Sequence, residues 1–388
     1  MLANLNRNIG LVLIMLHFLM DFFVKLLLYI GIDEDPGNST IVYFKILIFI
    51  GLIMFAIINF KSNKKLLFNL LLICVTGFVG WLSYFHGIDS SELYIFIKTM
   101  VRYVYPFFWL IFFLKLSPKQ IENSIIGFRL VLFINTILIL IGLLFNIGLF
   151  SAYDGRFGYD GVFYLANDAS PFYFLGLVVL YDRIRAIHKE WMNVFEFLFL
   201  VIGSLLLGTK TAYLFILIFT IYHIYSTKNY IQGLIMIVFL LAILIMSGVF
   251  TFFIDLAFTT DILTSVLSFR NELFLSRIIP LIENWGVVNY FFGGCNYIET
   301  YIQMDLIDVF VFFGIVGGSI YCIIFFKEFF YVKANSYLIY IGIVYVILGA
   351  LAGHFYPSGV VAIYLALVCI SQRKKNNFES STHTRLAH

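Results

Sequence analysis

Hydrophobic residues occur in about a dozen long runs, which are separated by short polar segments and fill most of the chain. A helix must contain about 20 residues to cross the roughly 30 Å hydrocarbon core of a bilayer. Because the runs reach or approach this length, each predicts a membrane-spanning helix. The expected spans cover residues 9–32, 41–60, 66–86, 94–114, 128–150, 171–184, 192–208, 211–226, 230–254, 303–326, 336–354 and 358–371. The pattern predicts an all-α polytopic membrane protein with about 12 transmembrane helices.

Two polar segments interrupt this series. Residues 151–170 are rich in Gly, Tyr and Asp, and residues 255–301 form the longest polar stretch. The apolar positions between Leu263 and Ile278 predict a short amphipathic helix on the membrane surface. Long loops between tightly connected helices are usually functional or disordered. We expect one transmembrane domain over residues 1–371 with these two outer loops, followed by a disordered tail over residues 372–388.

Composition agrees with this class, since 62% of the residues are hydrophobic, 12% are charged and 46 are phenylalanine. The first run is too long for a cleavable signal and lacks a small-residue cleavage site, so we expect it to be the first span.

The four cysteines show no disulfide or metal-ligand spacing. Phosphate-loop and dinucleotide patterns are absent, and Asp33-Glu34-Asp35 is more typical of a solvated turn than of a cation site. We expect no metal, no cofactor and no nucleic-acid partner.

The basic residues near span ends are sorted by side. If the N-terminus is cytoplasmic, fourteen of them lie at inner loops or span ends: Lys61, Lys64, Lys65, Lys115, Lys119, Arg183, Arg185, Lys189, Lys228, Lys327, Lys333, Arg373, Lys374 and Lys375. Only four lie outside: Arg156, Lys210, Arg270 and Arg277. Cytoplasmic loops carry an excess of Lys and Arg, so this orientation is favoured. Twelve spans then return the C-terminus to the cytoplasm.

The four outer cations are candidate ligand-binding residues, together with Lys98 and Arg102 on span 94–114. A charge near the bilayer centre costs about 2.5–3.5 kcal/mol, so a buried Arg102 would need a partner or a task. Arg270 and Arg277 are seven residues apart and would share one face of a continuous helix. Such cations suit a diphosphate carried on a lipid. The alternative for each is a solvated or snorkelling side chain, which we favour for Lys45 and Arg129.

Candidate general bases are expected on the same outer side of the membrane as these cations. His86 and His354 are at outer span ends, where an imidazole can take a proton from a sugar hydroxyl. Glu299, Asp305 and Asp308 flank the start of span 303–326 and can act as the base, orient it or contact sugar hydroxyls. The alternatives are a hydrogen-bonded structural histidine and carboxylates that pair with the nearby arginines.

One face of the first span carries His17, Asp21 and Lys25, which recur every four residues. We predict a buried structural ion pair between Asp21 and Lys25. A proton relay is the alternative.

Four segments of the chain resemble the bacterial O-antigen ligase and polysaccharide polymerase (Wzy-like) family of membrane glycosyltransferases. They are Gly155-Arg156-Phe157-Gly158, with Asn167 and Pro171 behind it; Gly208-Thr209-Lys210-Thr211-Ala212; the series Arg277, Phe292-Gly293-Gly294, Glu299, Asp305 and Gly314-Ile315-Val316-Gly317; and Gly353-His354. Together they cover roughly residues 150–360. Lys210 stands where the family more often has Arg, and Gly293-Gly294-Cys295 departs from its usual Gly-x-Gly turn.

The resemblance implies a GT-C-type helical bundle with a long extracytoplasmic loop, located in the bacterial plasma membrane. It implies a polyprenyl-diphosphate-linked oligosaccharide as donor and metal-independent glycosyl transfer on the outer face. The resemblance implies that Arg156, Lys210 and Arg277 bind the diphosphate, and that His354 assists the acceptor. A flippase and a chain-length regulator are the expected protein partners.

The leading hypothesis is therefore a polymerase of lipid-linked repeat units for a capsule, an exopolysaccharide or an O-antigen. A ligase that transfers the finished glycan is its neighbour. A transporter such as a flippase is the alternative of a different class. It would be expected to carry charges around a cavity at mid-depth and to consist of related halves.

Overall fold

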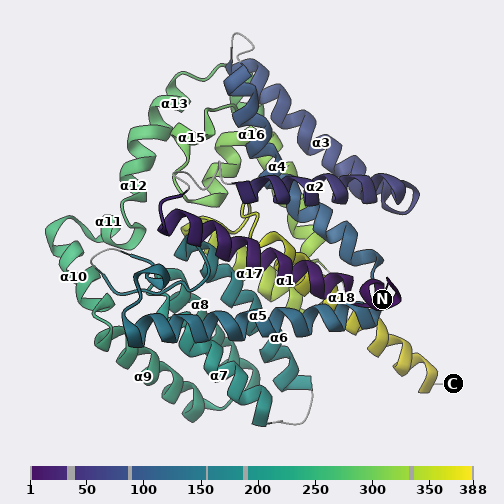
Figure 1. The fold of residues 1–388 in the computed structure, drawn as a ribbon. Helices are drawn as coiled ribbons and strands as arrows, with labels where there is room; N and C mark the ends of the chain where they lie inside the picture. Colours follow the sequence, from purple (N-terminus) through teal and green to yellow (C-terminus); the bar gives the residue numbers. More distant parts are fainter. Residues whose placement is uncertain are drawn as a thin grey trace. The chain divides into compact units, whose positions relative to one another are not determined.

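The computed structural model describes residues 2–32, 40–85, 90–153, 156–186, 191–331 and 336–386. Helices make up 83% of the structure, and the described residues contain no strand beyond one bridge between Ser151 and Tyr159. The all-α class predicted from the sequence is therefore confirmed (Figure 1). Some residues singled out above lie outside the described residues: Asp33-Glu34-Asp35, His86, Gly155, Lys189 and Lys333.

The chain divides into two compact units, each built from two stretches of sequence. Unit 1 comprises Met1–Lys45 and Asn123–Val266, and unit 2 comprises Ile46–Glu122 and Leu267–His388. The candidate site residues are divided between them. Arg156 and Lys210 belong to unit 1, whereas Arg102, Arg270, Arg277, Glu299, Asp305 and His354 belong to unit 2.

Unit 1 is organised around α6 (Ala166–Ala186), whose central part is buried. Every residue from Ala169 to Tyr181 is buried, and α6 packs against α7 and α8. The other elements of this unit are α1 (Leu2–Tyr29), the first turn of α2 (Thr40–Ile58), most of α5 (Pro118–Phe145), η1 (Gly148–Phe150), α7 (Trp191–Leu206), α8 (Lys210–Thr227), α9 (Tyr230–Met246), α10 (Val249–Thr259) and nearly all of α11 (Ile262–Leu267).

Unit 2 is centred on α16 (Asp305–Phe329), which packs against α3, α14 and α17, while α18 lies along α4. Its core is aromatic, with Tyr103, Phe107, Tyr321 and Tyr345 all fully buried. The remaining elements are the rest of α2, α3 (Phe60–Tyr84), α4 (Ser90–Lys115), α12 (Arg270–Leu273), the π-helical turn η2 (Phe274–Ile278), α13 (Ile279–Glu283), α14 (Val287–Phe292), α15 (Tyr297–Thr300), α17 (Ser336–Leu351) and α18 (Ala362–Leu386). Helix α18 continues through most of the residues expected to form a disordered tail.

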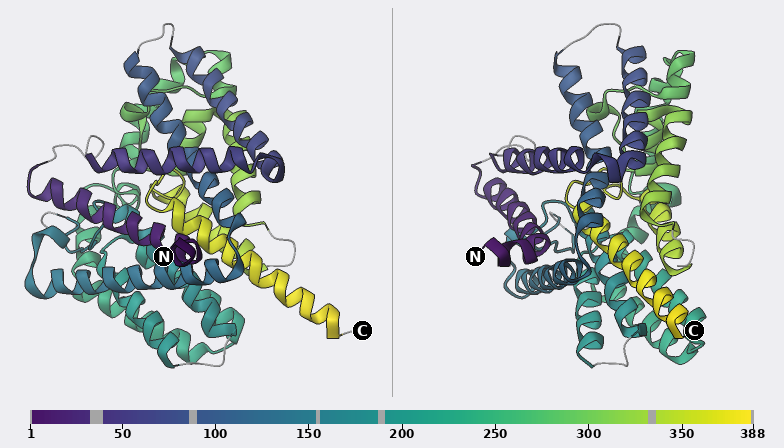
Figure 2. Two further views of the ribbon diagram at one scale, coloured as in Figure 1. Left: turned by 45° about the vertical axis from the view of Figure 1, so that its right-hand side comes forward. Right: turned by 90° about the vertical axis from the view of Figure 1, so that its right-hand side faces the viewer.

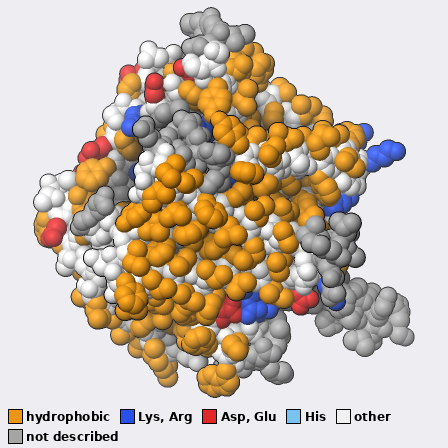
Figure 3. Space-filling model, in the orientation of Figure 1, with side chains coloured by type: hydrophobic (Ala, Val, Ile, Leu, Met, Phe, Trp, Pro, Cys, Tyr) orange, Lys and Arg blue, Asp and Glu red, His pale blue; other side chains and the backbone are white. Residues whose placement is uncertain are grey.

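Each hydrophobic run of the sequence contains a helix. Within the described residues, five helices are long and apolar enough to cross a membrane: Asn8–Tyr29, Phe60–Tyr84, Ser90–Lys115, Pro118–Phe145 and Asp305–Phe329. Helices α9 and α10 meet at a bend of 67° and make a sixth if they form one broken span. Hydrophobic side chains cover most of the surface that α1 and α5 present in Figure 3. These features indicate a helical membrane protein.

The predicted helix between Leu263 and Ile278 is interrupted. Ser268 and Phe269 have φ values of +55° and +64°, which end α11 and turn the chain before α12 begins at Arg270. The π-helical turn η2 follows directly and shifts the helical phase. The predicted amphipathic helix is therefore not one continuous α-helix, and a π-helical turn lies between Arg270 and Arg277.

Two glycines bring the turn after α14 close to α16. Gly293 has φ +76°, and Gly314 has φ +70° and ψ −175°, which interrupts α16. A Cβ atom on Gly293 would collide with the carbonyl oxygen of Phe312. Both residues therefore combine a left-handed backbone with a contact that only glycine allows. Two segments that the sequence analysis singled out separately thus pack against each other.

We expect Gly293→Ala to lower the free energy of unfolding by about 1–3 kcal/mol, because it adds both backbone strain and a backbone collision. Gly51→Ala in α2 is the matched control, since nothing lies within 4 Å of its Cβ position. It should leave stability unchanged or raise it by up to about 1 kcal/mol. Thermal unfolding of the purified variants in detergent checks this, and equal stability of the two variants would contradict it.

Candidate functional site

Asp305, the first residue of α16, organises the loop that carries His354. Its side chain is fully buried, and its carboxylate accepts backbone hydrogen bonds from the N–H groups of His354 at 3.0 Å, Phe355, and Tyr356 at 2.9 Å. The helix N-terminus also favours a negative charge at this position. With both oxygens engaged by amides, Asp305 is placed to hold the loop rather than to remove a proton.

Asp308 acts in the same way one turn later. It is 2% exposed and accepts the backbone N–H groups of Ile302 at 3.1 Å and Met304 at 3.0 Å. The first turn of α16 therefore holds two separate loops through two buried carboxylates. Charged acceptors make hydrogen bonds worth about 1.5–3 kcal/mol each, so these contacts define the local backbone.

His354 lies in the loop that Asp305 holds. Its φ of +73° is in the left-handed region, which non-glycine residues rarely adopt. The half-buried imidazole meets the ring of Tyr301 edge-on, with 6.2 Å between the ring centroids. A non-glycine residue held in a rare backbone conformation is a candidate functional residue, because the surrounding contacts must maintain it.

The two arginines of the long loop reach the same region. Arg277 donates to the carbonyl oxygen of Tyr301 at 3.1 Å, and its side chain is exposed. Arg270 is half-buried and donates to the carbonyl oxygens of Leu351 at 3.5 Å and Leu267 at 3.4 Å. Its charge also interacts favourably with that of Asp308. We call Arg270, Arg277, Tyr301, Asp305 and His354 the His354 cluster.

Unit 1 contains a second group of cations, with Arg156 and Lys210 both on aromatic rings. The guanidinium carbon of Arg156 lies 3.5 Å from the ring centroid of Tyr153 and 5.9 Å from that of Phe253. The Lys210 ammonium lies 3.9 Å from the centroid of Phe253 and donates to the carbonyl oxygens of Ser265 and Val266. The two cations therefore share one aromatic side chain.

The backbone explains why these two segments meet. The N–H of Tyr159 donates to the carbonyl of Leu206 at 2.9 Å, so the segment after Arg156 runs beside the end of α7. Gly208 turns the chain with φ +67°, and Thr209 caps α8 by accepting the N–H of Ala212. Lys210 is thus the first residue of α8, directly beside the Arg156 segment. We call Arg156, Lys210, Tyr153 and Phe253 the Arg156 cluster.

The charges of the first helix are paired differently from the prediction. Lys25 forms a buried ion pair with Asp160, and Asp21 pairs with Lys45. The predicted Asp21–Lys25 pair is therefore wrong, because each residue finds an opposite charge on another segment. Burial raises the pKa of Asp160 to about 7, although the neighbouring Lys25 opposes this shift.

The snorkelling expected of Lys45 and Arg129 is also wrong, because Lys45 pairs with Asp21 and the Arg129 guanidinium pairs with Glu196 on α7. Arg102 is exposed on the surface of α4. Glu299 is exposed in the short helix α15. Neither Arg102 nor Glu299 has a described contact with the residues of the His354 cluster. The Lys98 ammonium lies 5.8 Å from the ring centroid of Tyr94.

Sequence reasoning overlooked the aromatic partners of both clusters. Tyr301, Tyr153 and Phe253 stand among 25 tyrosines and 46 phenylalanines, so composition cannot distinguish them. Asp160 could not be singled out either, because the segment of residues 151–170 also contains Asp154 and Asp168. A charge in such a segment requires a partner when it is buried.

No known protein family, no curated protein and no solved structure shows a significant match to this chain.

We expect Asp305→Asn to destabilise the protein by about 1–3 kcal/mol, because an amide offers one acceptor oxygen where the loop needs two. The exposed Glu272→Gln removes the same charge in α12 and should change stability by less than about 0.5 kcal/mol. Thermal unfolding in detergent gives the stability, and limited proteolysis reports whether residues 352–358 become accessible. An Asp305→Asn variant as stable and as resistant as wild type would overturn the role given to this carboxylate.

Cys295, in the turn between α14 and α15, should be unreactive in the folded protein. Burial raises the pKa of its thiol from 9.0 to about 12, and only the thiolate reacts. At pH 8 the thiolate fraction is then about a thousandfold lower than in the unfolded chain. Alkylation by iodoacetamide, resolved by peptide mass spectrometry, should be correspondingly slow until the protein is unfolded in detergent. Labelling that is equally fast in both states would disprove the burial.

Proposed function

We propose that the protein polymerises oligosaccharide repeat units carried on polyprenyl diphosphate, and so builds a capsule, an exopolysaccharide or an O-antigen. The His354 cluster is the observation that favours this activity most. It holds the backbone of His354 on a buried carboxylate at the beginning of α16, and two arginines donate to the carbonyl oxygens of Tyr301 and Leu351 in the same region. A lipid-linked anionic substrate needs a cationic region at such a position.

The chemistry requires little from the protein. The oxygen of an acceptor hydroxyl bonds to the sugar carbon that carries the diphosphate, and the bond from that carbon to the diphosphate oxygen breaks. The electron pair leaves with polyprenyl diphosphate, and the hydroxyl proton passes to the imidazole of His354. Arg270 and Arg277 neutralise the leaving diphosphate, without a metal ion in this role. Asp305 serves as a positioning residue, since its carboxylate accepts three backbone N–H groups of the loop around His354.

The Arg156 cluster of unit 1 is, by itself, a second candidate for binding a diphosphate. Stacking of the Arg156 guanidinium on Tyr153 uses its flat face, so the N–H groups at its edge can bind phosphate oxygens. Lys210 adds a point charge beside the same aromatic ring, Phe253. The aromatic contacts restrict both side chains and so reduce the entropy lost on binding.

The proposal includes twelve membrane crossings in a GT-C-like bundle, with both termini cytoplasmic and the His354 cluster on the outer face. A basic end of unit 2 supports this orientation. It contains Lys61, Lys64, Lys65, Lys115, Lys119, Lys327, Arg373 and Lys374. These residues meet because Lys115 donates to Ser62 at 2.5 Å, Lys374 to the carbonyl of Leu116, and Arg373 to those of Lys327 and Glu328. Lys327 and the His354 cluster lie at opposite ends of α16.

A ligase would use the same donor and the same groups, and differs only in its acceptor. A flippase is the competing function, and the buried ion pairs of α1 are the observation that favours it. Transporters carry charges inside the membrane along their substrate or ion pathways. Here each of these charges has a partner of opposite sign, which also fits a purely structural role.

The decisive experiment is turnover by the purified protein in proteoliposomes with polyprenyl-diphosphate-linked repeat units, with products resolved by size. We expect a ladder of longer lipid-linked glycans. His354→Ala should lower the rate by about 10²–10⁴-fold, the usual contribution of a general base. Arg277→Gln should lower it by about 10–10³-fold through weaker charge stabilisation. Glu272→Gln, an exposed charge change in α12, should retain wild-type activity.

The outcomes separate the alternatives. Transfer of one glycan to a different acceptor without a ladder would identify a ligase. Movement of the substrate across the bilayer without any transfer would identify a flippase and refute the enzymatic proposal. Full activity of a correctly folded His354→Ala variant would remove His354 from the mechanism.

A further inference from the structure

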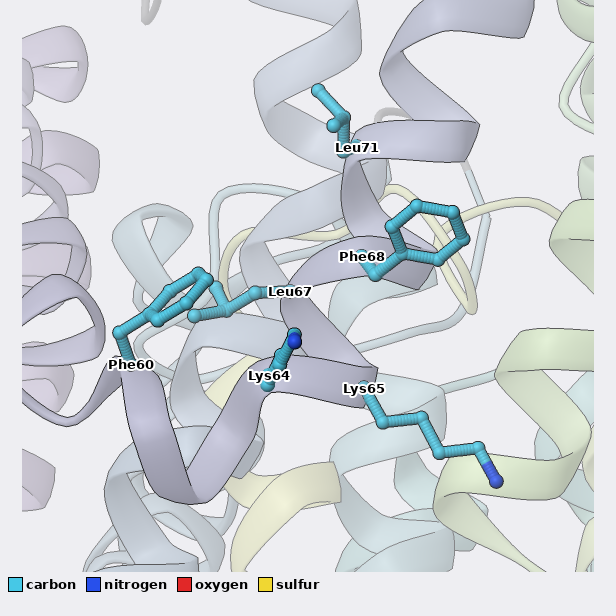
Figure 4. A pocket seen from close by; sticks show the side chains of 6 residues that line it. All are labelled: Phe60, Lys64, Lys65, Leu67, Phe68 and Leu71. Carbon is cyan, nitrogen blue, oxygen red and sulfur yellow. The ribbon is translucent and has the colours of Figure 1, made fainter.

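Helix α3 carries a groove whose lining surface is almost entirely apolar and includes the aliphatic stems of two lysines. Its volume is about 500 Å³, and it is lined by Phe60, Lys64, Lys65, Leu67, Phe68 and Leu71 (Figure 4). We call it the α3 groove. Most of these residues recur at the spacing of one helix face, so the groove follows the helix axis. All of them belong to unit 2.

The groove begins at a sharp bend in the chain. Helix α2 ends at Ile58 and α3 starts at Phe60, and the two helices run at a steep angle to each other (Figures 1 and 2). Asn59 forms the bend with a non-helical backbone, and its carbonyl accepts hydrogen bonds from Ser62 and Asn63. These contacts fix the start of α3 and place Phe60 at one end of the groove.

The apolar lining is exposed rather than covered by protein. Phe60 is 50% exposed, Phe68 65% and Leu71 60%. The exposed apolar surface continues beyond the groove along α3, with Val75 at 50% and Leu82 at 47%. Because α3 is long and apolar enough to cross the membrane, this surface is suited to contact a hydrocarbon chain along its length.

The charged side chains of the groove all have one sign. Lys64 and Lys65 are exposed at its beginning, and the amino acids of α3 include no Asp or Glu. Lys115 lies against the same turn through its hydrogen bond to Ser62. Positive charges at one end and a continuous apolar face beyond them match the headgroup and the acyl chain of an anionic lipid. Basic pockets at membrane surfaces bind such headgroups.

We propose that the α3 groove is a binding site for an anionic phospholipid. The phosphate faces Lys64 and Lys65, and one acyl chain lies along the apolar residues of α3. A free phosphate would use the lysines but not the apolar face, and a zwitterionic lipid would use the apolar face but not the charges. This site is separate from the proposed glycosyl transfer and does not depend on it.

Native mass spectrometry of the detergent-purified protein tests the site, with dioleoylphosphatidylglycerol and dioleoylphosphatidylcholine titrated separately. We expect the anionic lipid to bind more tightly. The double variant Lys64→Gln/Lys65→Gln should weaken it by about 25-fold, on the basis of about fivefold for each lysine near a membrane surface. Binding of the zwitterionic lipid should change by less than about threefold.

The matched control is Lys61→Gln/Lys119→Gln. It removes the same charge from the same end of unit 2, but neither residue lines the groove. It should retain tight binding of the anionic lipid, and thermal unfolding verifies that both double variants are folded. Equal loss in both variants would mean a diffuse charge effect and overturn the site. Competition by millimolar glycerol phosphate, which lacks acyl chains, would identify a phosphate site instead of a lipid site.

Discussion

The buried carboxylate of Asp305 is the interaction on which the candidate catalytic region depends. A carboxylate removed from water must regain its hydrogen bonds, and Asp305 does so from three consecutive backbone amides of the His354 loop. The amides gain an acceptor that no other part of the described loop supplies. The hydrogen bonds between Asp305 and these amides therefore offset two unfavourable terms, the burial of the carboxylate charge and the left-handed backbone of His354. Because these hydrogen bonds are made to the main chain, they fix the backbone position of His354, and this position does not depend on what the imidazole binds.

Both clusters use the same construction, although they lie in different units. In each, a glycine-containing turn directs the chain against the end of a helix, and cations are held there by carbonyl oxygens or aromatic rings. Gly208 precedes α8 and Lys210, while Gly353 precedes His354 beside the start of α16. A long cationic side chain loses much rotamer freedom when it binds an anion. Contacts that restrict it beforehand reduce this loss, which is the physical advantage of cations held by the protein over freely solvated ones.

The charges inside the helical segments follow a different rule, namely neutralisation by a distant partner. Lys25 pairs with Asp160, which is 135 residues away, and Arg129 pairs with Glu196, 67 residues away. A nearby opposite charge on the same helix was available to Lys25, but the ion pair forms across segments instead. Removing one member of such a buried pair is strongly unfavourable, so these pairs restrict how the helices of unit 1 can be arranged.

The sequence alone determined the class and the positions of the helices. Hydrophobic runs of sufficient length must be helical in a bilayer, because the backbone groups can be satisfied only internally, and a helix occupies every predicted run. The same local reasoning located His354, Asp305 and the four outer cations as candidates. It did not predict the break at Ser268 and Phe269, the π-helical turn or the partner of any charge. Those features depend on contacts between residues far apart in the chain, such as Asp305 with the His354 loop, and only the tertiary structure decides them.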